Sequence, residues 1–91
     1  MNEKPVLVSM DADHQIYLLA MLADYHTCII EQWHCGERQN DEVAETCYLL
    51  GNIEGRLLYS GITEEDLEIM QCWEDELEEW KESNNGQICK L

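Results

Sequence analysis

The fold of this chain is decided by residues 13–35, which read DHQIYLLAMLADYHTCIIEQWHC and form its most apolar stretch. Apolar side chains recur there at spacings of three and four, which is the period of an α-helix. Two stripes with this spacing lie side by side. The first consists of Ile16, Leu19, Ala23, His26, Ile30 and Trp33, and the second of Leu18, Leu22, Tyr25 and Ile29. Together they predict one helix whose apolar face is more than roughly 100° wide.

A helix this apolar needs cover from more than one direction, and the rest of the chain is short and acidic. We therefore expect a second copy of the chain to supply part of that cover. The second stripe is predicted to be an isologous interface of a homodimer, through Leu18, Leu22, Tyr25 and Ile29.

The composition is that of one small, strongly acidic domain, residues 1–91. Its 91 residues include 20 Asp or Glu against 5 Lys or Arg, which gives a formal net charge of −15. This balance excludes simple binding to the phosphate backbone of nucleic acids, because such binding requires cationic side chains. It disfavours anionic membranes for the same reason. The negative charge is compatible with three roles: solubility alone, attraction to basic proteins, or imitation of a nucleic acid.

The termini and cysteines indicate a cytoplasmic protein. The N-terminal residues MNEKPVLVSM have no long apolar run after a basic start, so we expect no signal peptide. The apolar run of residues 16–30 is interrupted by Asp24 and His26 and is too short to span a bilayer. The 5 cysteines are an odd number without a CxxC pair. We therefore expect a reduced chain in which most cysteines act as small core residues.

Local signals predict an all-α fold: a small three-helix domain with a long central apolar helix and two antiparallel helices. The helices are expected at about residues 13–35, 41–59 and 64–82, after a short extended N-terminal arm and before a frayed tail at 84–91. Asp11 or Asp13 is expected to cap the first helix, and Gly36 to end it.

The second and third helices are also marked by their ends. Asn40 is the expected N-cap of the second helix, and Gly61 its end. Thr63 is expected to cap the third helix, with Asp66 completing a capping box. Inside the second helix, Gly51 and Gly55 each cost about 1 kcal/mol relative to Ala. Their presence predicts the close approach of a neighbouring helix or indole.

A metal site is one alternative, because His26, Glu31, His34 and Cys35 crowd one helix. Glu31 and His34 have the spacing found in carboxylate-bridged di-iron bundles, which need two such pairs and two further glutamates pointing inward. Glu31 falls on the polar side of the helix, however, and its pair with His34 lies in the last turn. We therefore expect no metal and no cofactor.

Enzymatic activity is also not expected. No serine lies in a Gly-x-Ser-x-Gly turn, and no glycine-rich loop is present to hold a phosphate. Three Glu-x-x-Glu pairs match the magnesium-binding spacing of helical enzymes that cleave nucleoside triphosphates, but 20 acids produce such pairs by chance. A small helical metal- or nucleotide-binding protein is the alternative function, and a homo-oligomeric scaffold is a third.

The third predicted helix carries the functional prediction. Residues 62–82 contain ten acids and one base, a local net charge of −9. Each close pair of like charges on a helix costs a few tenths of a kcal/mol, so a face that keeps them over several turns indicates selection for its field. The expected partner-binding residues are Glu64, Glu65, Glu68, Asp75, Glu78, Glu79 and Glu82.

These residues predict a non-enzymatic acidic protein that blocks a basic, nucleic-acid-handling protein by imitating a nucleic acid. Small inhibitors encoded by phages and other mobile elements, including anti-defence proteins, have this character, although no motif here identifies such a family. The expected partners are a basic protein and a second copy of the chain, with no direct binding to nucleic acid or membrane.

Overall fold

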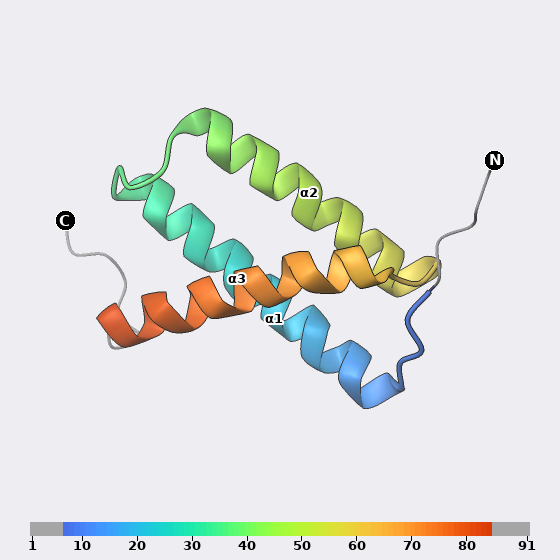
Figure 1. Ribbon diagram of the computed structural model, residues 1–91. Helices are drawn as coiled ribbons and strands as arrows, with labels where there is room; N and C mark the ends of the chain where they lie inside the picture. The colour runs from blue at the N-terminus through green and yellow to red at the C-terminus, as the bar shows by residue number, and fades with distance from the viewer. Residues whose placement is uncertain (1–6, 85–91) are drawn as a thin grey trace.

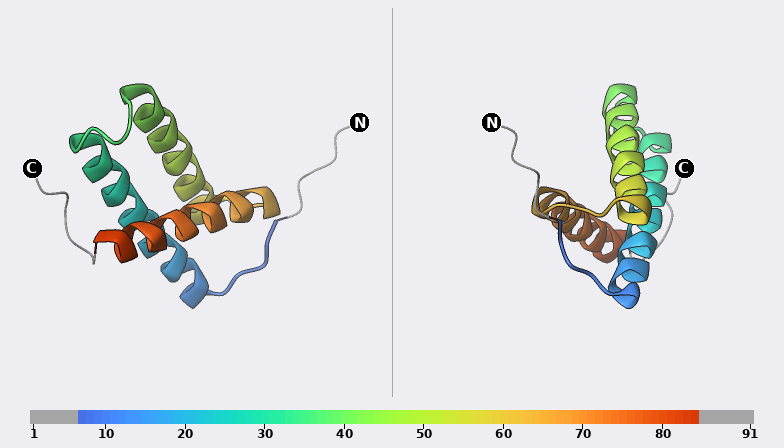
Figure 2. Two further views of the ribbon diagram at one scale, coloured as in Figure 1. Left: turned by 60° about the vertical axis from the view of Figure 1, so that its left-hand side comes forward. Right: turned by 90° about the vertical axis from the view of Figure 1, so that its right-hand side faces the viewer.

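The computed structural model describes residues 7–84 and has the predicted all-α fold of three helices. Helix α1 spans Ala12–His34, α2 spans Asn40–Tyr59, and α3 spans Glu64–Asn84. α1 is central, since it packs against both other helices. α2 runs antiparallel beside it, and α3 crosses α1 on one side of the layer that α1 and α2 form (Figure 1 and Figure 2). Of the predicted tail, Asn84 belongs to α3, and residues 85–91 lie outside the described residues.

The ends of α1 follow the sequence signals. Of the two candidate caps, Asp11 is the one used: its carboxylate accepts a hydrogen bond from the backbone N–H of His14 at 2.8 Å. At the other end, Gly36 has a φ of 81°, the left-handed conformation that a glycine adopts without strain.

The start of α2 differs from the prediction. Gln39 is the N-cap rather than Asn40, and the Glu42 carboxylate accepts a hydrogen bond from the Gln39 backbone N–H at 3.2 Å. The Asn40 side-chain oxygen instead accepts a hydrogen bond from Trp33 Nε1 at 2.6 Å. Asn40 is the first residue of α2, and this hydrogen bond joins the start of α2 to the end of α1.

The predicted capping box at the start of α3 is confirmed. The backbone N–H of Thr63 donates to Asp66 Oδ2, and the backbone N–H of Asp66 donates to Thr63 Oγ1, both at 3.2 Å. Asp66 also accepts two hydrogen bonds from the guanidinium of Arg56, at 3.0 Å from Nε and 2.9 Å from Nη2. A single carboxylate, 4% exposed, therefore caps α3 and joins it to α2.

The second apolar stripe of α1 lies in the core of a single chain. Leu18, Leu22, Tyr25 and Ile29 are between 0 and 5% exposed, since α2 and α3 cover them. The Tyr25 ring also stacks on that of Trp73, with 5.2 Å between ring centroids. Their assignment to a dimer interface is therefore corrected: a second copy reaches these four residues only if the helices of the chain separate.

The N-terminal arm is extended, as predicted, within the described residues 7–10. Leu7 pairs with Thr63 in an isolated β-bridge, and the Val8 N–H donates to the carbonyl of Ile62 at 2.8 Å. Gly61 has a φ of 98°, and a Cβ placed there would meet the Leu7 side chain at 3.1 Å. The positive φ therefore favours glycine at this turn, and a larger residue would also have to displace the Leu7 side chain slightly.

The cysteines depart in part from the expected pattern. Cys28 is a buried free thiol, Cys47 is partly buried against the core, and Cys72 is exposed. Cys35 is disulfide-bonded, so the expectation of a fully reduced chain is wrong for this residue.

Candidate protein-interaction surface

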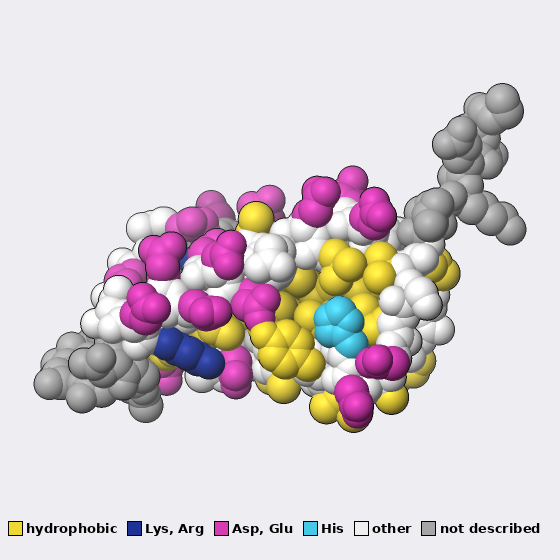
Figure 3. All heavy atoms as spheres, turned by 60° about the horizontal axis from the view of Figure 1, so that its bottom comes forward, with side chains coloured by type: hydrophobic (Ala, Val, Ile, Leu, Met, Phe, Trp, Pro, Cys, Tyr) yellow, Lys and Arg dark blue, Asp and Glu magenta, His cyan; other side chains and the backbone are white. Residues whose placement is uncertain are grey.

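The orientation of α3 is set by its apolar face. Met70, Trp73 and Leu77 are 1%, 7% and 4% exposed, and helical spacing places them on one side of the helix. The opposite side faces solvent and is acidic (Figure 3). We define the outer face of α3 by the seven predicted binding residues, which are all exposed: Glu64, Glu65, Glu68, Asp75, Glu78, Glu79 and Glu82.

The outer face has the charge spacing of a nucleic-acid strand. Glu64 and Glu82 are 18 residues apart, which corresponds to about 27 Å along the helix axis. Seven carboxylates divide this length into six intervals, an average of about 4.5 Å per charge, with the widest gap between Glu68 and Asp75. One strand of duplex DNA carries a charge about every 3.4 Å.

Besides Asp66, two other acids of α3 are used inside the chain. Glu74 accepts a hydrogen bond from the hydroxyl of Tyr17. Glu76 accepts hydrogen bonds from the hydroxyl of Tyr25 at 3.1 Å and from Arg38 Nη2 at 2.9 Å. Neither acid is among the seven of the outer face, so α3 separates structural carboxylates from outward-facing ones.

The basic side chains within residues 7–84 are directed away from the outer face. Arg38 pairs with Glu76 at 2.9 Å, Arg56 with Asp66 at 2.9 Å, and Lys81 with Asp24 at 3.7 Å. Among the outer-face carboxylates, Asp75 accepts one weak hydrogen bond, from Gln71 at 3.5 Å. The negative potential of this face is therefore not neutralised by the described part of the chain.

A depression beside the C-terminal half of α3 extends the acidic surface. Its volume is about 280 Å³, and it is lined by Gln32, Glu37, Glu76, Glu79, Trp80 and Ser83. Carboxylates that line a depression suit a cationic side chain, which forms charge-assisted hydrogen bonds with them. Sequence reasoning missed Glu37 and Trp80 as surface residues, because only the packing of α1 against α3 brings them together.

The candidate metal ligands are not gathered into a site. His26 is exposed, and the His34 ring lies against Trp33 with 5.3 Å between ring centroids. The sulfur of Cys35 is in a disulfide. Across residues 7–84, no group of three or more His, Cys, Asp or Glu side chains is arranged to hold a metal ion.

The buried thiol is not activated as a nucleophile. Burial raises the pKa of Cys28 to about 11, with a smaller opposing effect of Arg38. The thiol is therefore protonated near neutral pH, and the thiolate is the reactive form. Burial, followed by the charge of Glu76, likewise raises the pKa of Tyr25.

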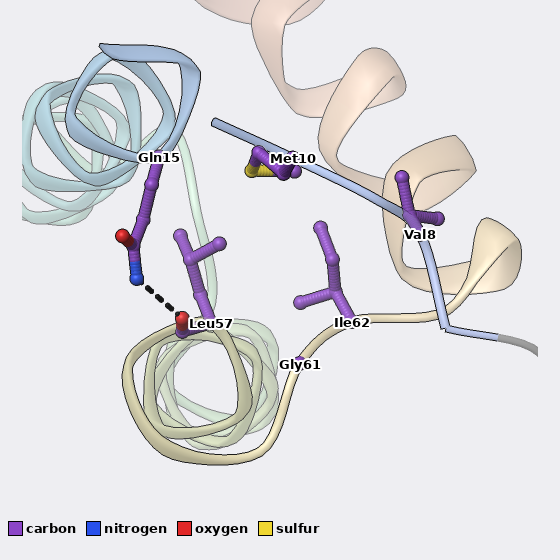
Figure 4. Close-up of a pocket in the computed structure, with 6 residues that line it drawn as sticks. All are labelled: Val8, Met10, Gln15, Leu57, Gly61 and Ile62. Atoms are coloured by element: carbon purple, nitrogen blue, oxygen red, sulfur yellow. Dashed lines mark hydrogen bonds between the residues drawn. The ribbon is translucent and has the colours of Figure 1, made fainter. Parts of the chain in front are cut away.

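A second cavity lies between the N-terminal arm, α1 and α2 (Figure 4). Its volume is about 160 Å³, and it is lined by Val8, Met10, Gln15, Leu57, Gly61 and Ile62. The Gln15 amide donates a hydrogen bond to the carbonyl of Leu57 at 2.8 Å. None of the lining side chains titrates, so this cavity offers neither acid–base nor metal chemistry.

Comparisons with protein-family models, with curated proteins and with solved structures give no match to this chain. None of the helices within residues 7–84 combines the length and apolarity needed to cross a membrane.

Proposed function

We propose that this chain is a non-enzymatic acidic protein that binds a basic, nucleic-acid-handling protein and blocks its nucleic-acid site. The observation that carries the proposal is the outer face of α3. It presents seven exposed carboxylates over about 27 Å, and none of them pairs with a basic side chain of the described residues.

The mechanism is electrostatic competition. A groove that binds a phosphate backbone is lined by Lys and Arg, and a row of carboxylates at similar spacing attracts the same side chains. The α3 helix is rigidly held by its packing on α1, so its charges are arranged before the partner arrives. The carboxylates of Glu37 and Glu79 in the depression offer a place for one projecting Arg or Lys of the partner.

The test is an affinity capture from a nuclease-treated lysate of the source organism, with the tagged chain as bait. Captured proteins are identified by mass spectrometry, and a duplex DNA of about 20 base pairs is then added as a competitor. We expect a basic DNA- or RNA-binding protein that the duplex displaces. Rising salt should also release it, because exposed charges are screened within about 8 Å at physiological ionic strength.

The decisive comparison uses two variants with the same net charge. Joint reversal of Asp75, Glu79 and Glu82 to Lys changes the net charge from −15 to −9 and should abolish capture. Reversal of three exposed acids away from α3, Asp13, Asp41 and Glu45, gives the same −9 and should preserve it. Glu78 is kept in both variants because it lines a depression with Tyr17 and Lys81.

Both variants are checked for a native circular dichroism spectrum before capture. Equal capture by the two variants, or capture that the duplex does not displace, would show that the outer face is only a solvated surface.

A further inference from the structure

The layer formed by α1 and α2 is covered by α3 on one side only, as the right-hand view of Figure 2 shows. α1 turns Tyr17 and Tyr25 toward α3, where they hydrogen-bond to Glu74 and Glu76. α2 turns Arg56 toward α3, where it pairs with Asp66. The other side of this layer is therefore formed by the opposite flanks of α1 and α2.

This opposite side, which we call the back face, displays part of the first apolar stripe of α1, while Leu19 and Ile30 of that stripe are partly buried against the core. Ile16 is 63% exposed and Trp33 is 40% exposed, while Ala23 and His26 between them are also exposed. From α2, helical spacing places Gly51 and the 45% exposed Leu58 on the same side.

The two flanks are aligned in an antiparallel register. The Gln15 side chain meets the Leu57 carbonyl at one end, at 2.8 Å, and Trp33 meets Asn40 at the other, at 2.6 Å. This register places Ile16 beside Leu58 at one end of the back face. Near the middle, the same register brings the small residues Ala23 and Gly51 together.

The size of the back face matches that of a protein interface. α1 has 23 residues and is therefore about 35 Å long. Two helices side by side are about 20 Å wide, which gives about 700 Å² for each copy. Stable complexes of standard size bury about 800 Å² on each partner.

The distribution of charge indicates which partner fits. Two copies of a chain with a net charge of −15 repel each other wherever their acidic surfaces meet. Helical spacing places one acidic residue, Glu54, on the back face. A surface depleted in charge and containing apolar and aromatic side chains is typical of the centre of an interface. Identical copies that meet there would each bring one carboxylate, that of Glu54, to the contact, against seven on the outer face of α3.

The glycines of α2 support close approach of a second helix pair. Gly51 and Gly55 have no atom within 4 Å of the position that a Cβ would occupy, apart from their own helix and chain neighbours. The prediction that a neighbouring helix or indole of the same chain approaches these glycines is therefore wrong within the described residues. Each still costs about 1 kcal/mol in a helix interior. An isologous contact would bring Gly51 of one back face close to Gly51 of its partner. A side chain at position 51 would hold the two helices apart.

We infer that a second copy of the chain docks on the back face, so that α1 and α2 of both copies form a four-helix core. The α3 helices then lie on the outside, and their outer faces point away from each other. This dimer uses the exposed stripe of α1, and the four core residues of the second stripe stay inside each copy.

The test is the mass of the full chain by sedimentation velocity at about 50 μM, with Gly51→Glu and Asn52→Glu as a matched pair. Both variants add one acid to α2 at exposed neighbouring positions, but helical spacing turns position 52 away from the back face. We expect twice the chain mass of 10.7 kDa, 21.4 kDa, for the natural chain and for Asn52→Glu. The Gly51→Glu variant should sediment at 10.7 kDa.

A second disrupting variant, Ile16→Glu, guards against a local effect at position 51, and circular dichroism verifies that each variant is folded. Rising salt should strengthen the dimer by screening its repulsion, whereas it weakens capture of a basic partner through α3. The two proposals can therefore fail separately. A natural chain that stays at 10.7 kDa, or dimers that persist in both Gly51→Glu and Ile16→Glu, would overturn the inference.

Discussion

Replacing Asp66 with Ala should destabilise the fold more than any other single change at the start of α3. Its carboxylate accepts a hydrogen bond from the Thr63 backbone and two from the Arg56 guanidinium, and the residue is only 4% exposed. The substitution therefore removes the reciprocal hydrogen bond of the capping box and the ion pair between α2 and α3 together, while the Thr63 hydroxyl still caps the helix.

The magnitude follows from these contacts. Loss of the hydrogen bond from the Thr63 backbone costs about 1 kcal/mol. The paired hydrogen bonds from Arg56 are charge-assisted, but the Arg56 side chain is 40% exposed, so solvent screening reduces their contribution to about 1–2 kcal/mol. The sum is about 2–3 kcal/mol. For a domain of 60–100 residues, 1 kcal/mol lowers Tm by roughly 4–8 °C, so we expect a decrease of roughly 10–20 °C.

Thermal unfolding at pH 7, followed by circular dichroism, measures this decrease. Thr63→Ala removes only the hydroxyl that caps α3 and should lower the stability by about 1 kcal/mol. Glu68→Ala, at an exposed position on the same helix, serves as the control and should stay within about 0.5 kcal/mol of the natural chain. An Asp66→Ala chain that melts within about 2 °C of the natural chain would refute this account of the α2–α3 junction.

The same site predicts a pH dependence. The hydrogen bonds from Arg56, with the Thr63 backbone, lower the pKa of Asp66 below its ordinary value of 3.8. A group whose pKa is lower in the folded state contributes stability above the unfolded pKa, and loses it as the pH falls through the folded pKa. The stability difference between the natural chain and Asp66→Asn should therefore be constant from pH 7 to about 5 and shrink below the ordinary Asp value. A difference that does not change down to about pH 2 would contradict this.

Three further predictions concern other parts of the chain. In the native protein, a thiol reagent such as Ellman's reagent should modify exposed Cys72 quickly. Cys28, 1% exposed and with its pKa raised to about 11, should react only on unfolding, and a Cys28→Ser chain should keep the fast phase. Tyr25→Phe keeps the ring stacked on Trp73 and loses the bond to Glu76, so calorimetry should show a loss of about 1 kcal/mol, against at least about 2 kcal/mol for Tyr25→Ala. Elemental analysis of protein purified without added metal should find no stoichiometric zinc or iron, and about one ion per chain would favour the metal-binding alternative.

The sequence alone determined where the helices begin and end, because those signals act over a few residues. The pair of Thr63 and Asp66 closes its capping box within one turn, and Gly36 and Gly61 adopt the left-handed conformation at the turns where they were expected. The misplaced cap of α2 shows the limit of local reasoning. Asn40 is a good capping residue, but the indole of Trp33, brought close by the α1–α2 packing, takes its side-chain oxygen.

The acidic outer face of α3 was also readable from sequence, since helical spacing separates its carboxylates from its apolar stripe. The structure added which acids are committed within the chain: Glu74 and Glu76 hold side chains of α1 and of the connector that follows it. The depression at Glu37 and Trp80 could not be predicted, because its walls come from segments far apart in the chain.

Only the tertiary structure decided which apolar stripe of α1 is the core. Both stripes have helical spacing, and a periodic pattern gives the faces of a helix without saying what covers each face. The packing of α2 and α3 against α1 buries Leu22 and Ile29 completely and leaves Ile16 63% exposed. This packing is fixed in part by contacts between residues distant in sequence, such as Tyr17 with Glu74 and Tyr25 with Trp73. Capping depends on neighbours within a turn and is written locally, whereas burial depends on where the other helices come to rest.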